Sequence, residues 1–98
     1  MENINKIELS GVIGTSREHK VGDTACVRFS LAVESVFKEA VRTDWFSCVY
    51  WLKAGETAER FSKGARILVK GRMRTQEYCG ENGEARRFYE VYVTEVEE

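Results

Sequence analysis

The chain has 98 residues, of which 43% are hydrophobic and 32% charged, and its formal net charge is −1. This length suits a single domain, and the composition excludes a disordered chain and a membrane protein. No apolar run approaches the roughly 20 residues of a membrane span, and the N-terminus lacks the apolar stretch of a signal peptide. We therefore expect one domain, residues 1–98, in the cytoplasm.

The first third of the chain predicts two strands separated by a loop. Residues 4–13 predict a strand kinked near Gly11, because a glycine inside a strand pattern often marks a bulge or bend. Residues 14–24 are polar and predict a loop, whereas residues 25–34 alternate between apolar and other side chains. The apolar face of this second strand consists of Ala25, Val27, Phe29, Leu31 and Val33, and the other face of Cys26, Arg28, Ser30 and Ala32.

The middle of the chain predicts a third strand and a short helix. Residues 35–43 predict a connection that leads into a strand at residues 43–52. Residues 54–64 change period: Ala58 and Phe61 lie three apart, and Gly64 is a typical helix stop.

The last third predicts a hairpin. Residues 65–78 form a strand pattern interrupted at Gly71, and residues 86–96 form another. Asn82-Gly83 between them is a strong tight-turn signal. The glycines also allow a phosphate-loop interpretation, but no lysine-serine pair and no helix pattern follow them.

Five short, kinked strands with one short helix between the third and the fourth predict an all-β domain. Glycines inside strands supply the bends that barrel closure needs, so we expect a Greek-key barrel with the element order of the OB fold. Periodicity alone supports only a small antiparallel β domain.

Cysteine and histidine give no sign of a metal site or of catalysis. The three cysteines form no CxxC pair, and Cys26 and Cys48 lie in alternating apolar runs, which favours buried small hydrophobes over a redox role. His19, the single histidine, lies in a polar segment and is interpreted as a solvated side chain. We expect no cofactor, no metal and no enzymatic activity.

The charges are segregated along the chain. Residues 60–87 contain eight Lys or Arg and three Glu, whereas residues 88–98 contain four Glu and no basic residue. A local basic field suits a nucleic-acid partner even when the net charge is close to zero. The alternative is a set of solvated strand faces without a partner.

The third strand is aromatic on both faces. If Phe46, Cys48 and Tyr50 pack inward, Trp45 and Trp51 stand outward, roughly 20 Å apart at about 3.3 Å per residue. Flat rings next to cations match the bases and phosphates of single-stranded nucleic acid. The alternative is that one or both tryptophans fill the core or a subunit interface. The cations and the further aromatic expected beside them are Lys70, Arg72, Arg74, Tyr78 and Arg86.

Five separate segments in one order resemble the bacterial single-stranded DNA-binding protein family. They are NKIELSG at 5–11, RFSLAVES at 28–35, TDWFSCVYW at 43–51, KGARILVKGRMRT at 63–75 and FYEVYVTEV at 88–96. The resemblance implies an OB barrel that binds single-stranded DNA in replication, recombination or repair. It places the family's stacking aromatics on Trp45, Trp51 and Tyr78, and its basic contacts on Arg72 and Arg74.

The sequence departs from the family pattern in four places, one of which is a connection at residues 36–42 that is shorter than usual. Val36 and Phe37 stand where the family usually has a tryptophan after Glu-Ser, so Phe37 is a candidate contact. Phe46 replaces a histidine that the family often places near a subunit contact; members assemble as homotetramers or homodimers. The family's disordered tail with its acidic tip is missing after EVEE, so we expect no tail-mediated protein partners.

Two alternatives stay open at this point. One is a protein similar to primosomal replication protein N, a tail-less dimeric OB relative that binds single strands. The other is an OB module whose aromatic surface binds a protein.

Overall fold

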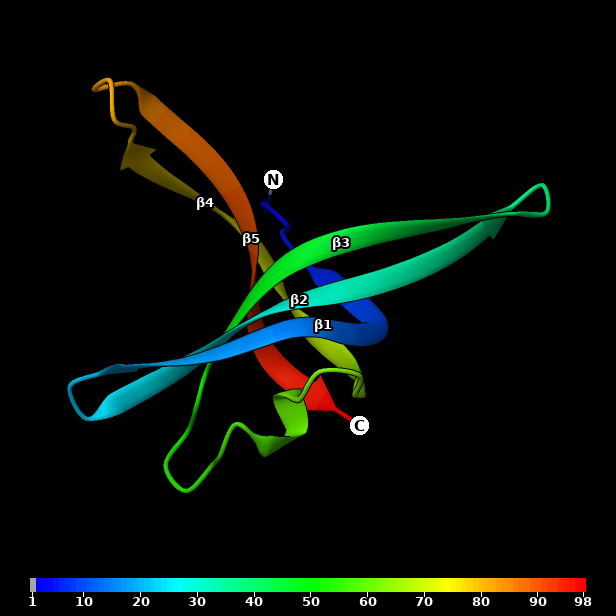
Figure 1. Ribbon diagram of the computed structural model, residues 1–98, viewed down its shortest axis with the longest axis horizontal. Helices are drawn as coiled ribbons and strands as arrows, with labels where there is room; N and C mark the ends of the chain where they lie inside the picture. The colour runs from blue at the N-terminus through cyan, green and yellow to red at the C-terminus, as the bar shows by residue number, and fades with distance from the viewer. Residues whose placement is uncertain (1) are drawn as a thin grey trace.

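Residues 2–98 of the computed structural model form five long strands and one short 3₁₀ turn (Figure 1). The elements are β1 (Ile7–Val21), β2 (Thr24–Phe37), β3 (Ala40–Trp51), η1 (Glu59–Phe61), β4 (Arg66–Cys79) and β5 (Ala85–Glu97). Within these residues the strands close into a barrel in the order β1-β2-β3-β5-β4, and β3 pairs with β5 in parallel. This closure is that of a five-stranded OB barrel, so the predicted fold class is confirmed.

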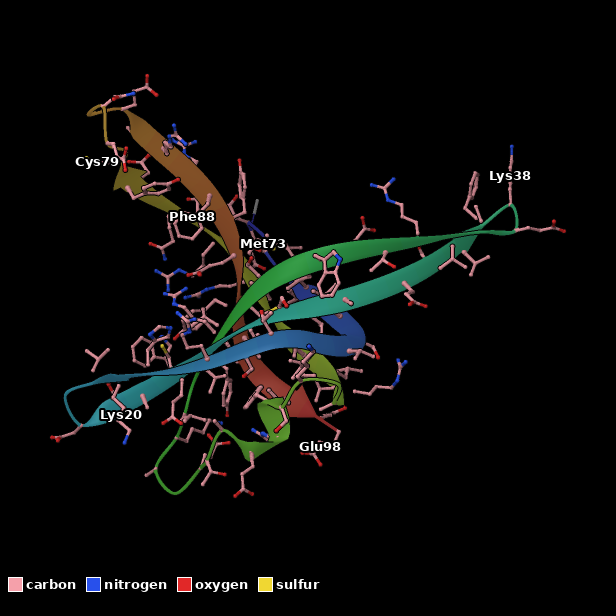
Figure 2. All side chains as sticks on the ribbon, in the orientation of Figure 1. Lys20, Lys38, Met73, Cys79, Phe88 and Glu98 are labelled. Carbon is pink, nitrogen blue, oxygen red and sulfur yellow. The ribbon has the colours of Figure 1, made fainter. Side chains whose placement is uncertain are left out.

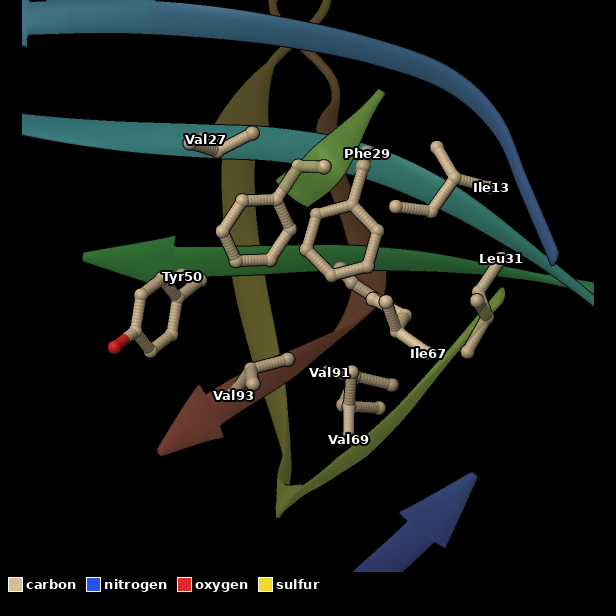
Figure 3. Packing of buried hydrophobic residues seen from close by; sticks show 11 residues of the cluster. Ile13, Val27, Phe29, Leu31, Tyr50, Ile67, Val69, Val91 and Val93 are labelled. Carbon is tan, nitrogen blue, oxygen red and sulfur yellow. The ribbon is translucent and has the colours of Figure 1, made fainter. Parts of the chain in front are cut away.

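Alternate residues of the strands fill the barrel. The face of β2 predicted to be apolar points inward, and Val27, Phe29 and Leu31 are at most 4% exposed. They pack against Ile67 and the other buried apolar residues of β4 and β5 (Figure 3). Within residues 2–98, no helix is long and apolar enough to cross a bilayer.

The segment between β3 and β4 closes one end of the barrel. The predicted short helix is a single 3₁₀ turn, and its Phe61 is fully buried. The Phe61 ring centroid lies 5.2 Å from that of Phe29 and 5.3 Å from that of Tyr50. This one aromatic side chain therefore connects the turn to two strands of the core.

Two segments predicted as connections are strand. Residues 14–21 extend β1 and pair with β2 as far as Val21 opposite Thr24, so the predicted loop 14–24 shrinks to a two-residue turn. The predicted connection 35–43 is likewise a hairpin, with Lys38 and Glu39 in its turn at φ 48° and 67°. Both extensions are exposed on their two faces, so they lack the alternation by which a strand is found in a sequence.

Long hairpins project from the barrel in different directions (Figure 1). The β4–β5 hairpin turns at the predicted Asn82-Gly83, where Gly83 has φ +77°. Gly71 lies at a register shift in β4, and a Cβ there would overlap the carbonyl oxygen of Tyr92. The predicted interruption at Gly71 is thus a bulge where two backbones touch.

The cysteines lie as expected. Cys26 and Cys48 are buried, at 3% and 2% exposure, whereas Cys79 is exposed at the end of β4. Burial, helped by the charge of Glu90, raises the pKa of the Cys48 thiol to about 12. Cys48 therefore stays protonated at neutral pH and behaves as a small hydrophobe.

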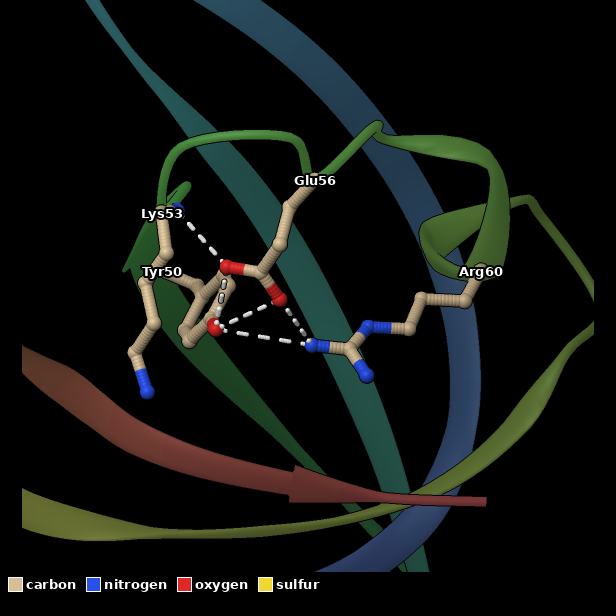
Figure 4. A network of polar contacts seen from close by, with 4 residues as sticks. All are labelled: Tyr50, Lys53, Glu56 and Arg60. Carbon is tan, nitrogen blue, oxygen red and sulfur yellow. Dashed lines mark hydrogen bonds and ion pairs between the residues drawn. The ribbon is translucent and has the colours of Figure 1, made fainter.

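A polar network holds the loop after β3 (Figure 4). The Glu56 carboxylate accepts hydrogen bonds from the Lys53 backbone N–H at 2.6 Å and from the Tyr50 hydroxyl at 2.8 and 3.0 Å. The Arg60 guanidinium lies 2.8 Å from the same carboxylate. The backbone hydrogen bond from Lys53, then that from Tyr50, and the charge of Arg60 lower the pKa of Glu56.

We expect this network to make stability depend on acidity. A carboxyl whose pKa is lower in the folded than in the unfolded chain stabilises the fold above its unfolded pKa, and the contribution is lost as the pH falls through the folded value. Glu56→Gln should therefore be less stable than wild type at neutral pH, and the difference should narrow below pH about 4. Urea unfolding at a series of pH values measures this. Glu59→Gln, an exposed neighbour, is the control, and a gap that stays constant with pH would contradict the prediction.

Candidate nucleic-acid interface

One continuous outer face runs across β2, β3, β5 and β4. Paired residues of neighbouring strands project to the same side of a sheet. The register sets Arg28 opposite Val49, Val49 opposite Tyr92, and Tyr92 opposite Arg72. The outer face therefore carries Arg28, Ser30, Trp45, Ser47, Trp51, Arg72, Arg74, Tyr78, Arg86, Phe88, Glu90 and Tyr92.

Both tryptophans lie on this outer face. Trp45 is 62% exposed and Trp51 is 38% exposed. The alternative in which they fill the core is therefore wrong, and the inward side of β3 is formed by Cys48 and Tyr50 instead. Exposed indole rings on a strand are available for stacking.

The Trp45 ring rests on the neighbouring strands. A Cβ at Gly14 of β1 would overlap Cζ3 of Trp45, and it would lie 2.9 Å from Cη2 of Trp45 and 3.0 Å from Oγ of Ser30. The indole thus spans β2 and reaches β1, where the absence of a side chain at position 14 leaves room for it. Because position 14 has no side chain, the indole ring can lie close to the backbone of β1.

We expect Gly14→Val to displace this ring without unfolding the barrel, because valine suits a strand and the tip of an exposed side chain can move. Binding to a ligand that stacks on Trp45 should weaken roughly two- to tenfold, at the low end of the value of one stacked base. In the double variant with Trp45→Ala, the substitution at position 14 should add nothing further, since it acts only through the indole. A double variant whose loss of affinity equals the sum of the losses in the two single variants would contradict this.

Tyr92 holds the two arginines of β4. The guanidinium carbon of Arg72 lies 5.2 Å from the Tyr92 ring centroid, and that of Arg74 lies 5.0 Å from it. Cations over an aromatic face are attracted by its quadrupole. Both charges are therefore kept above the sheet.

The β4–β5 hairpin continues the aromatic and basic surface. The rings of Tyr78 and Phe88 lie 5.8 Å apart and are tilted by 59°. Arg86 pairs across the strands with Tyr78, so both project from the same face. Figure 2 shows Phe88 on this hairpin, well away from Lys38 at the tip of the β2–β3 hairpin.

Two of the candidate residues are not brought to this surface in the expected way. Phe37 is 74% exposed, but it pairs with Ala40 on the opposite face of the β2–β3 hairpin from Trp45. The Lys70 ammonium lies 3.7 Å from a carboxylate oxygen of Glu8 and 3.9 Å from one of Glu97. Its charge is therefore partly balanced by neighbouring acids.

Sequence reasoning missed a polar group in the centre of the outer face. Nη1 of Arg28 donates to Oε2 of Glu90 at 2.6 Å, and Nε2 of Gln76 lies 3.3 Å from Oε1 of Glu90. Alternation predicts that Arg28 lies on the outward face of its strand. It does not show that Glu90, 62 residues later in the chain, lies beside it. Only the barrel register brings the two together.

The comparisons with known proteins agree with this fold. The family model described as "Single-strand binding protein family" matches residues 4–98. The chain is 35% identical over 99 residues to "Single-stranded DNA-binding protein 1" of Streptococcus pyogenes, covering 95% of this chain and 72% of that protein. It is 35% identical over 94 residues to "Single-stranded DNA-binding protein" of Clostridium perfringens, covering 92% of this chain and 62% of that protein.

A third relative and a solved structure are also similar to this chain. "Single-stranded DNA-binding protein" of Xanthomonas campestris is 31% identical over 102 residues, which cover 96% of this chain and 59% of that protein. The chain therefore spans about three fifths to three quarters of the length of these relatives. The structure "Plasmodium falciparum SSB complex with ssDNA" superposes with a TM-score of 0.83 at 20% identity, over 98% of this chain and 95% of that chain.

The fold and the outer face define an OB-barrel protein with an exposed aromatic and basic surface. The match of the family model over residues 4–98 then gives the particular group. The chain belongs to the single-strand binding protein family.

Proposed function

We propose that this protein binds single-stranded DNA, with little dependence on sequence, in DNA replication, recombination or repair. The observation that carries the proposal is the outer face, which bears the exposed rings of Trp45 and Trp51 on β3 and Arg72, Arg74 and Tyr78 on β4. Every base has a flat face that can stack, and every nucleotide has a phosphate that a cation can contact. Binding of this kind keeps an exposed strand from pairing again.

The two tryptophans of the chain supply the measurement. Since both lie on the outer face, an oligo(dT) strand that covers the face should quench the intrinsic fluorescence. The affinity should fall with salt, with a slope in log–log form of about −0.7 for each phosphate contact. Duplex DNA of the same length is the control and should bind more weakly, because its bases cannot stack on the protein.

The same titration separates the protein-binding alternative from the other two. An OB module that binds a protein would show no quenching at low salt. A factor similar to primosomal replication protein N would show the same quenching of tryptophan fluorescence as the first proposal, and its partners would have to be found separately.

We favour a non-enzymatic binding protein that needs no cofactor and acts in the cytoplasm, where replication exposes single strands.

We also propose that the protein acts as a homo-oligomer, a dimer or a tetramer. An exposed apolar side chain in the segment before β1 supports this: Ile4 is 79% exposed. Apolar surface of this kind is typical of contacts between subunits. A mass measurement in solution tests it, and a monomer at micromolar concentration would contradict it.

A further inference from the structure

A pocket opens in the outer face at the point where the two long hairpins diverge. The ladder between β3 and β5 begins at Cys48 opposite Val91, and before that pair the strands separate (Figure 1). The pocket measures about 290 Å³ and is lined by Thr15, Arg28, Ser30, Ser47, Phe88 and Glu90, among others. It therefore draws residues from β1, β2, β3 and β5 into one hollow.

Its polar wall presents an acceptor next to a donor. Glu90 is only 4% exposed, and its carboxylate uses one oxygen for Arg28 and the other for Gln76. A carboxylate has about four acceptor positions, so acceptor capacity is left over. The Arg28 side chain is 50% exposed and has five N–H donors, of which Nη1 donates to Glu90. The ion pair holds both groups in fixed positions.

Its aromatic walls are flat and partly exposed. Phe88 lines the pocket and is 39% exposed, with the Tyr78 ring packed at its side. On the other side, Ser30 lines the pocket, and a Cβ built at Gly14 would touch both the Trp45 indole and Oγ of Ser30, so the indole lies beside this wall. A flat ring that enters here can stack on an aromatic side chain while its edge meets Arg28 and Glu90.

The donors and acceptors of Arg28 and Glu90 match the hydrogen-bonding groups of one base better than those of the others. Guanine has two adjacent donors, N1–H and the N2 amino group, which suit a carboxylate, and two adjacent acceptors, O6 and N7, which suit an arginine. Thymine has a single ring N–H and no amino group, and adenine and cytosine each have one amino group. A buried carboxylate that lines the pocket beside an arginine can therefore satisfy more hydrogen-bonding groups of guanine than of any other base.

We propose that this pocket is a guanine subsite within a binding face that otherwise accepts any base. The inference rests on the proposed function, since it assumes that single-stranded DNA covers the outer face. One guanine-preferring position does not make the whole face specific, because the stacking aromatics tolerate every base. It gives the protein a preferred register on strands that contain guanine.

The test compares strands that differ at one position. An oligo(dT) strand, the same strand with one central dG, and the same strand with deoxyinosine in its place are titrated at one salt concentration. The dG strand should bind about fivefold or more tighter than oligo(dT), at the low end of the discrimination given by one bidentate contact. Deoxyinosine, which lacks only the N2 amino group, should lose most of this gain.

A pair of variants locates the effect. Glu90→Gln keeps the shape of the side chain and removes the charged acceptor, so the ratio of dG to oligo(dT) affinity should fall to about one. Glu77→Gln is the matched control, because Glu77 lies on the opposite face of the same hairpin and pairs with Arg87 at 3.0 Å. Its ratio should equal that of wild type.

The possible failures are distinguishable. If oligo(dT) binds but the dG and deoxyinosine strands bind equally well, or a central dA or dC gives the same gain as dG, the guanine subsite is overturned and the proposed function stands. If oligo(dT) does not bind at all, the proposed function itself fails. Should Glu90→Gln not fold, the comparison of dG with deoxyinosine on wild type decides the matter alone.

Discussion

Replacing Trp45 with alanine should weaken the binding of oligo(dT) by about 1–3 kcal/mol, which is roughly 5- to 150-fold in affinity. The indole is 62% exposed on the outer face, so its removal takes away a stacking surface and opens no cavity in the core. Fluorescence of the remaining Trp51, or anisotropy of a labelled strand, measures the loss. Thermal unfolding should show nearly the same midpoint as wild type.

The chain offers a closely matched control for this variant. Tyr89 is 61% exposed, but it lies next to Glu90 in β5 and therefore projects to the other side of the sheet. Tyr89→Ala should leave the affinity within about twofold of wild type, because a side chain on the far face cannot stack with a base on the outer face. Equal losses in the two variants would show that exposure of an aromatic ring, and not its face, is what matters.

Replacing Phe61 with alanine should lower the free energy of unfolding by about 3–5 kcal/mol, the usual cost of truncating a buried phenylalanine. Phe61 is fully buried, and its ring centroid lies 5.2 Å from that of Phe29 and 5.3 Å from that of Tyr50. The short turn that carries it has little structure of its own to hold the end of the barrel closed. Urea unfolding followed by circular dichroism measures the change.

Phe37→Ala is the control for this second variant. Phe37 is 74% exposed at the end of β2, so its truncation should change the free energy of unfolding by less than about 0.5 kcal/mol. A loss below about 1 kcal/mol in Phe61→Ala would mean that the barrel closes without this side chain.

Local patterns predicted the parts of the fold in which neighbouring residues face different environments. Alternation in residues 25–34 identified the buried face of β2, and the pair Asn82-Gly83 identified the β4–β5 turn. The same alternation turned Trp45 and Trp51 outward once Cys48 and Tyr50 were placed in the core. In each case the signal lies within a few residues of the structure that it predicts.

The hairpin extensions could not be found in this way. Residues 14–21 and 35–43 are exposed on both faces, and their strand conformation is held by the ladder with a neighbouring strand. The turn at Lys38-Glu39 also lacks the glycine or asparagine by which such turns are usually found. Their structure depends on partners, and a sequence pattern does not show which partner a strand will have.

The sequence by itself determined that this chain is an all-β domain in which Trp45 and Trp51 share one face of a strand, because alternation of side chains is a property of each strand alone. The tertiary structure decided that this face is exposed and does not line the core. Only the tertiary structure decided which charges meet on the outer face. Arg28 and Glu90 pair across 62 residues, Arg72 and Arg74 meet over Tyr92, and Phe37 turns to the opposite face from Trp45. These contacts depend on the register between strands, which is set when the whole barrel closes.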